Sequence, residues 1–258
     1  MSRLFLVLVF FSTSALAQGF EHAHKAWDAL LKKHVLLLDG GKASQLRYAE
    51  LAKERVALKS YLDALSAVKP EEFNAWSKPQ RMAFLINAYN AFTAEKILTR
   101  YPNIKSIWDF GKLFGNPFKD DFFSLLGRRM TLDGIEHETL RKPGAYDEPR
   151  LHFAVNCAAI GCPLLREEAY VPERLEAQLE EQARRFLSDR SRNRLAGGRL
   201  ELSKIFDWFK EDFGVRERFF AKYATQLADG AEQQKLIADG KAPISHLDYD
   251  WTLNDARR

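Results

Sequence analysis

The sequence is poor in the residues that build disulfide-rich, collagen-like or low-complexity proteins. Its 258 residues contain only two cysteines, 14 glycines and nine prolines, too few for a cysteine-stabilised scaffold or a four-cysteine zinc site. An excess of one charge is also lacking, because 39 Lys and Arg residues are balanced by 35 Asp and Glu residues, for a net charge of +4. This small and scattered excess argues against nucleic-acid binding as the main task of the protein.

Long apolar runs are lacking too, apart from one at the start of the chain. The run over residues 4–11 follows a short basic segment and precedes a small-x-small pattern at residues 15–17, the pattern that signal peptidase cuts. It is far shorter than the roughly 20 residues that a spanning helix needs. We therefore expect a signal peptide over residues 1–17, no membrane span after its removal, and export of residues 18–258 to the periplasm or out of the cell.

The rest of the chain has a globular composition with mixed periodicities. Hydrophobic residues make up 46% of the sequence, enough to bury a sizeable core. Apolar residues spaced three and four apart predict helices at 20–38, 48–68, 71–76, 80–100 and 172–186. Shorter segments predict a hairpin around Gly127-Arg128, strands at 151–156 and 199–202, and a final extended piece at 244–251. We expect a helix-rich α+β fold with a small sheet of short strands, in a single domain over residues 18–258.

The helix predicted to begin at Gln80 carries two amides on one face, Asn87 and Asn90, with Tyr89 between them in the sequence. An amide on an apolar helix face loses hydration unless its donor and its acceptor both find partners. Two interpretations stay open. In one, Asn87 orients a catalytic histidine while Asn90 and Tyr89 contact a substrate; in the other, both amides bind the backbone of a neighbouring loop.

An acid and an imidazole follow the predicted hairpin, at Glu136 and His137. Asp133 is the expected N-cap of a short helix there, with Glu136 placed to complete a variant of the capping box. In that interpretation His137 is a surface residue. In the other, His137 faces a cleft and acts as a general base, because the ordinary pKa of histidine lies near neutrality.

The segment richest in chemically useful side chains covers residues 150–163 and contains His152, Cys157 and Cys162. A strand over 151–156 would place His152 and Cys157 on opposite faces. At the end of this strand Cys157 could be a nucleophile, with either histidine as its base. Three states of the cysteines stay open: a Cys157–Cys162 disulfide, two buried inert thiols, or one reactive thiol.

Motifs for metals, nucleotides and serine hydrolases are missing. No helical His-x-x-x-His or Cys-x-x-Cys pair brings two metal ligands together. There is also no Gly-x-Gly-x-x-Gly, no phosphate-binding loop and no Gly-x-Ser-x-Gly elbow. We therefore expect neither a metal nor a cofactor.

Five segments in consistent order resemble the family called domain of unknown function 547 (DUF547). They are residues 84–90, 132–141, 152–163, 202–206 and 247–251. The resemblance spans about residues 72–254 and implies no activity, since the family is named for lacking an established one. Bacterial members that look like this chain tend to be exported and to have one domain. The motif positions that it implies are Asn87, Tyr89, Asn90, Glu136, His137, Arg141, His152, Cys157, Cys162 and Pro163.

Amide, acid, imidazole and thiol are the residue types used by thiol hydrolases and acyl transferases. One hypothesis is a papain-like or transglutaminase-like enzyme that acts on an amide or peptide bond of a small-molecule or peptide ligand. Its candidate residues are Cys157 as nucleophile, His137 or His152 as base, Glu136 or Asn87 as orienter, and Asn90, Tyr89 and Arg141 as substrate contacts. The alternative is a non-catalytic envelope binding or scaffold domain, with a Cys157–Cys162 disulfide and a buried polar network.

Overall fold

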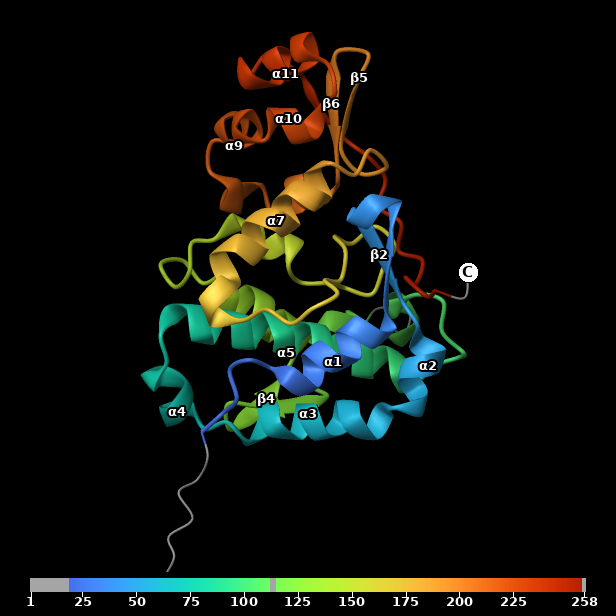
Figure 1. Ribbon diagram of the computed structural model, residues 1–258, viewed down its shortest axis with the longest axis vertical. Helices are drawn as coiled ribbons and strands as arrows, with labels where there is room; N and C mark the ends of the chain where they lie inside the picture. The colour runs from blue at the N-terminus through green and yellow to red at the C-terminus, as the bar shows by residue number, and fades with distance from the viewer. Residues whose placement is uncertain (1–18, 112–114, 257–258) are drawn as a thin grey trace, which may run out of the picture.

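The computed structural model describes residues 19–111 and 115–256, so the expected signal peptide lies outside the described residues. Helices dominate this part of the chain, and its short strands form three small sheets. Figure 1 shows the N-terminal helices at one end of the molecule and the C-terminal helices at the other. The predicted helix-rich α+β fold is confirmed. No helix within the described ranges is long and apolar enough to cross a membrane.

Helix α5 (Lys78–Leu98) is the centre of the N-terminal region. Ser77 caps it, because the Ser77 side chain accepts a hydrogen bond from the backbone of Gln80 while the Gln80 side chain accepts one from the backbone of Ser77. From Met82 to its end every residue of the helix is buried, so α5 is packed on all sides. The helix predicted to begin at Gln80 is confirmed.

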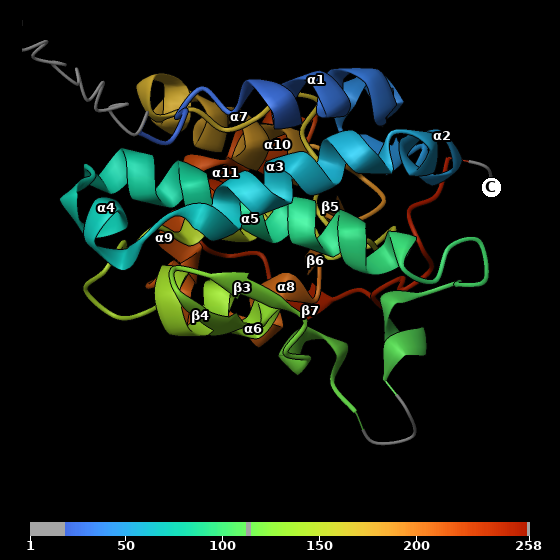
Figure 2. The same cartoon turned by 90° about the horizontal axis from the view of Figure 1, so that it is seen from below.

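The other N-terminal elements are α1 (Lys25–His34), β1 (Val35–Leu38), η1 (Asp39–Gly41), β2 (Ala43–Leu46), α2 (Tyr48–Lys53), α3 (Arg55–Ala67) and α4 (Pro70–Ala75). Helix α3 contacts both α1 and α5, and Figure 2 shows these three helices in succession. The helix predicted over 20–38 is wrong beyond His34, because β1 pairs with β2 there. The helix predicted over 48–68 is divided at Glu54, whose carboxylate contacts His34 of α1. In both places tertiary contacts override helical spacing.

The predicted hairpin is confirmed as strands β3 (Phe123–Leu125) and β4 (Arg128–Met130), after the short 3-10 helices η2 (Ile107–Phe110) and η3 (Pro117–Lys119). The turn lies at Leu126-Gly127, one residue earlier than predicted. Both turn residues have positive φ values, 52° and 71°. This two-residue connection matches the right-handed twist of the strands, and glycine adopts it without strain.

The short helix after the hairpin consists of α6 (Leu132–Ile135) and a π-helical turn, η4 (Glu136–Leu140). Its N-cap is Thr131, whose side chain accepts a hydrogen bond from the backbone of Gly134. The prediction of Asp133 as N-cap is therefore wrong, because a hydroxyl two residues earlier already performs that role. Glu136 is not needed at the cap, and its side chain is buried.

Residues 151–156 do not form a strand. Instead, Pro149–Phe153 form the 3-10 helix η5, with Pro149 at its first position. Glu148 caps η5 by accepting a hydrogen bond from the backbone of Arg150. The prediction failed because a short apolar run fits a buried strand and a buried helical turn equally well.

The packing of η5 places one histidine between two hydrophobic cores. Leu151 belongs to the core around α5, whereas Phe153 belongs to a second core made of C-terminal phenylalanines and leucines. His152 lies between these two anchors in the sequence and is itself buried. Its position is thus fixed from both sides.

The C-terminal region contains the second core. Its elements are η6 (Pro172–Arg174), α7 (Leu175–Leu187), β5 (Arg194–Ala196), β6 (Arg199–Leu202), α8 (Ile205–Trp208), η7 (Lys210–Phe213), α9 (Arg216–Lys222), α10 (Ala224–Leu227), α11 (Ala231–Ala238) and β7 (Ile244–His246). Strand β6 pairs antiparallel with β5 and parallel with β7. The predicted helix over 172–186 and strand over 199–202 are confirmed.

Arg150 fixes η5 to α7. Its buried guanidinium binds Glu148, next to η5, and also Glu176 and Glu180 of α7, with N···O distances of 2.6 to 3.3 Å. These charge-assisted bonds hold the backbone that carries His152.

Replacing Arg150 by glutamine is expected to lower the free energy of unfolding by about 2 kcal/mol, because the change removes charge-assisted bonds from three carboxylates. Arg184→Gln is the matched control, since Arg184 binds the same Glu180 from an exposed position, and a loss of about 0.5 kcal/mol or less is expected. Urea unfolding followed by circular dichroism measures both. Equal losses would show that Arg150 adds nothing beyond a surface ion pair.

Candidate active site

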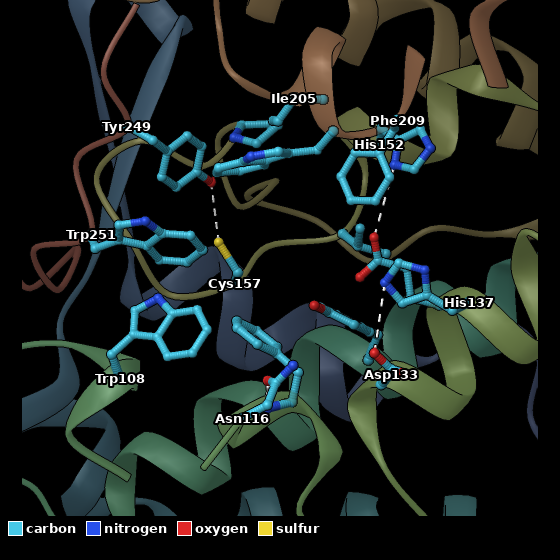
Figure 3. Close-up of a pocket in the computed structure, with 16 residues that line it drawn as sticks. Trp108, Asn116, Asp133, His137, His152, Cys157, Ile205, Phe209, Tyr249 and Trp251 are labelled. Atoms are coloured by element: carbon cyan, nitrogen blue, oxygen red, sulfur yellow. Dashed lines mark hydrogen bonds and ion pairs between the residues drawn. The ribbon is translucent and has the colours of Figure 1, made fainter. Parts of the chain in front are cut away.

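A cavity of about 490 Å³ is lined by residues of α5, η4, η5 and α8, together with Tyr249 and Trp251 near the C-terminus. Its volume lies within the range of small-molecule sites, roughly 300–1,000 Å³. Figure 3 shows its two sides. His137, His152 and Asp133 lie on one side, and Cys157 lies with Tyr249 and further aromatic residues on the other.

His152 is oriented by a carboxylate and by an aromatic ring. Its Nε2 lies 2.6 Å from Oδ2 of Asp212, and its ring stacks on Phe209 with centroids 4.1 Å apart. The nitrogen bound to a carboxylate carries the proton, so in the neutral ring Nδ1 is the free base. Nδ1 has no hydrogen-bond partner and lies 3.8 Å from Oε1 of Glu136. Burial lowers the pKa of His152, although Asp212 opposes this effect.

Asp212 of η7 is held by two partners. Arg141 donates to both of its oxygens, at 2.5 and 3.1 Å, and His152 is the second partner. Burial alone would raise the pKa of Asp212, but hydrogen bonds from His152 and Arg141 lower it well below its usual range. Asp212 is therefore ionised and can stabilise a protonated imidazole. Arg141 is a positioning residue here, and the predicted direct substrate contact stays a prediction.

Glu136 is the second carboxyl group of this side, in a contrasting environment. Its side chain is only 10% exposed and forms a hydrogen bond with Tyr89. Burial raises the pKa of Glu136 to about 7, against the lowering effect of Tyr89 and Arg141. Burial also raises the pKa of Tyr89, so the phenol keeps its proton and donates it to the carboxyl oxygen.

His137 lies at the rim of the cavity and is exposed. Its Nδ1 accepts a hydrogen bond of 2.5 Å from Arg141, and its Nε2 lies 3.8 Å from Oδ1 of Asp133. Burial of part of the ring lowers the pKa of His137. In His137 the nitrogen that could accept a proton already accepts the hydrogen bond from Arg141. In His152 that nitrogen, Nδ1, has no hydrogen-bond partner, so His152 is better suited to act as a base.

Asn87 and Asn90 bind backbone rather than the cavity. Asn87 donates to the carbonyl of Tyr170 at 2.7 Å and accepts from the Tyr170 amide at 3.1 Å. Asn90 donates to the carbonyl of Ala154 at 2.9 Å and accepts from the amide of Asn156 at 2.8 Å. Both amides thus have the loop-binding arrangement, and neither touches an imidazole in these contacts.

Cys157 and Cys162 form a disulfide. Of the two, Cys157 lines the cavity and Cys162 is buried. The hydroxyl of Tyr249 lies 3.2 Å from Sγ of Cys157, and burial raises the pKa of Tyr249. In this state Cys157 presents a bonded sulfur rather than a free thiol.

Five aromatic residues, named here the aromatic wall, form the other side of the cavity: Trp108, Phe118, Trp208, Tyr249 and Trp251. Trp251 contacts each of the others, with ring centroids 4.6 to 6.3 Å apart. Trp108 and Trp208 stay partly exposed, at 39% and 43%. Such a wall offers ring faces to a planar or cationic ligand.

Sequence reasoning missed Asp212 and the aromatic wall. Asp212 lies in residues 206–213, where acids alternate with four aromatic residues. This density of acids and rings was the available signal, since exposed polar segments rarely carry so many aromatic residues. Residues 247–251 contributed to the family resemblance but not to the predicted site.

The described residues contain no group of three or more His, Cys, Asp or Glu side chains arranged to hold a metal ion. The site in this part of the chain is therefore built from acids, imidazoles, aromatic rings and a disulfide.

The free energy of unfolding is expected to fall as pH rises from about 4.5 to 7. The pKa of Glu136 is 4.5 without the fold and about 7 within it, so in this window only the folded chain keeps the proton, and the loss reaches about 3 kcal/mol above pH 7. Glu136→Gln removes this titration. Its stability relative to the wild type should therefore rise across the window, as measured by urea unfolding at several pH values.

Glu138→Gln supplies the matched control, because it makes the same chemical change on an exposed side chain of the same turn. A constant stability difference between Glu136→Gln and the wild type from pH 4.5 to 7.5 would contradict the raised pKa.

A family model described as "Protein of unknown function, DUF547" matches residues 73–187. No curated protein and no solved structure shows a significant match to the chain. The matched segment contains Tyr89, Glu136, His137, His152 and Cys157 of the cavity, whereas Asp212 and much of the aromatic wall follow it. The resemblance to DUF547 is thus confirmed over residues 73–187.

Proposed function

We propose that the cavity is the active site of a hydrolase or acyl transferase that acts on amide or peptide bonds. The observation that carries this proposal is the state of His152. One ring nitrogen is bound to Asp212, and the other has no hydrogen-bond partner and lies beside Glu136. A buried imidazole with one nitrogen fixed and one free is suited to accept a proton.

The two carboxyl groups have complementary roles in this proposal. Asp212 is ionised and stabilises His152 when the ring takes up a proton. Glu136 keeps its own proton up to about pH 7 and can protonate a leaving nitrogen or oxygen. His152 Nδ1 removes a proton from the nucleophile, which attacks the carbonyl carbon, and the leaving group takes the proton of Glu136.

The nucleophile depends on the state of the disulfide. With Cys157 and Cys162 joined, the nucleophile is water activated by His152. The thiol-dependent mechanism, with Cys157 as nucleophile, belongs to a reduced form in which the sulfur carries a negative charge. Both routes use Glu136 as the acid, and His152, which lies across the cavity from Cys157, is the base of the water route.

A second candidate function is a non-catalytic envelope binding or scaffold domain. The disulfide favours it, because a bridged Cys157 offers no thiolate. The full pairing of Asn87 and Asn90 with backbone also fits a polar network that fixes the fold. In this alternative the aromatic wall binds a ligand that is not converted.

Export of the chain is part of the proposal. The pattern of residues 1–17 supports it, and the disulfide fits an oxidising compartment. A papain-like or transglutaminase-like fold remains a proposal as well.

His152→Gln is expected to lower kcat/KM at least roughly 100-fold, because the variant loses its proton acceptor. The assay uses p-nitrophenyl acetate and a panel of N-acetyl aminoacyl p-nitroanilides, with the oxidised and the reduced chain measured separately. His246→Gln is the matched control, since His246 lies on β7 and outside the cavity. Equal rates in the two variants would overturn the proposed base. Ligand binding by calorimetry without any turnover would support the non-catalytic alternative.

The rate should depend on pH with two limbs. The acid limb lies below the ordinary histidine value, because burial lowers the pKa of His152, and the base must be neutral to act. The alkaline limb lies near pH 7, where Glu136 loses its proton. A profile of kcat/KM from pH 4 to 9 measures both limbs. In Glu136→Gln the alkaline limb should disappear, and an unchanged limb would exclude Glu136 as the acid.

A further inference from the structure

The two sulfurs of the disulfide have different surroundings. Cys157 is partly exposed and lines the cavity. Cys162 is only 2% exposed and is not among the residues that line it. A molecule that enters the cavity can therefore reach Sγ of Cys157 but not Sγ of Cys162.

The backbone supports negative charge on the buried sulfur. Sγ of Cys162 accepts hydrogen bonds from the amide of Cys157 at 3.0 Å and from the amide of Ala159 at 3.4 Å. Between these residues Ala158 has a positive φ of 64°, a conformation that makes neighbouring amides converge on one point, as in anion-binding nests. The amide of Ala158 is itself held by Asn156 Oδ1 at 3.0 Å.

This arrangement meets the two requirements of thiol–disulfide exchange. The attacked sulfur must be accessible, and the departing sulfur must be stabilised as a thiolate. Cys157 meets the first requirement and Cys162 meets the second. We propose that the cavity oxidises small thiols by exchange at Cys157, an activity beyond the proposed hydrolysis and independent of it.

The first step forms a bond between the sulfur of a substrate thiolate and Sγ of Cys157. The Cys157–Cys162 bond breaks, and its electron pair leaves on Cys162, where the two amides receive it. In the second step another substrate thiolate attacks the substrate sulfur of the mixed disulfide and releases Cys157 as a thiolate beside the Tyr249 hydroxyl. Two thiols thus become one disulfide, and the protein bridge takes up two electrons and then two protons.

The charges of the cavity define the class of thiol. Asp133 and Glu136 line it, and none of its lining residues within 19–111 and 115–256 is a Lys or an Arg. The aromatic wall adds ring faces, which attract cations. An aminothiol, whose ammonium group faces the Asp133 carboxylate, the oxygens of Glu136 and the rings, therefore fits this cavity better than a thiol that carries a second negative charge.

The first experiment identifies the attacked sulfur in the full chain. The folded protein reacts briefly with cysteamine and is then unfolded in urea that contains N-ethylmaleimide, so that the buried Cys162 is also labelled. Trypsin then releases both cysteines in one peptide, residues 151–166. Fragment masses are expected to place cysteamine on Cys157 and maleimide on Cys162. The proposal would be overturned by cysteamine on Cys162 or on both cysteines equally. It would also be overturned if neither cysteine reacted in the folded chain while the urea-unfolded chain did react, because that result identifies an inert structural bridge.

The second experiment tests the class of thiol. Cysteamine and 2-mercaptoethanesulfonate are compared, each rate being divided by its rate with the urea-unfolded chain. Cysteamine should be favoured by about tenfold or more at low salt, and the preference should shrink as salt is added. Equal ratios would overturn the assignment to aminothiols. Cys162→Ser provides an independent reading, because its free Cys157 should form a mixed disulfide with cystamine, whereas the Cys162 of Cys157→Ser should not.

Discussion

The side-chain amide of Asn90 is the contact on which the rest of the site depends. It binds the carbonyl of Ala154 and the amide of Asn156, so the backbone that leaves η5 is attached to the buried helix α5. This short stretch joins His152 to Cys157. Without the two hydrogen bonds, two backbone groups and the side-chain amide would be buried without these partners, which is a costly arrangement. The imidazole and the disulfide therefore share one anchor.

The two acids beside the imidazole, Asp212 and Glu136, have different protonation states because their environments differ. Asp212 is surrounded by the donors of Arg141 and His152 and stays ionised. Glu136 is buried beside the hydroxyl of Tyr89, and burial raises its pKa, so it keeps its proton to near neutrality. Such pairs, with pKa values moved in opposite directions, are common in catalytic centres.

Some elements could be predicted from the sequence, but the prediction failed where tertiary contacts or a few residues determined the local structure. The helix α5 and the hairpin followed from spacing and from a glycine turn. Residues 151–156 were misassigned because a strand and a 3-10 helix bury a short apolar run in the same way. The role of Thr131 as N-cap was missed, which hid the burial of Glu136. Asp212 could not be connected with His152, because 60 residues separate them in the chain and only the fold brings them together.

Three of the five tryptophans of the chain belong to the aromatic wall, and Cys157 of the disulfide lies on the same side of the cavity (Figure 3). Indole emission responds to the polarity of its surroundings and to nearby sulfur. The intrinsic tryptophan fluorescence of the protein is therefore expected to report both ligand binding in the cavity and the oxidation state of Cys157 and Cys162, with no label attached.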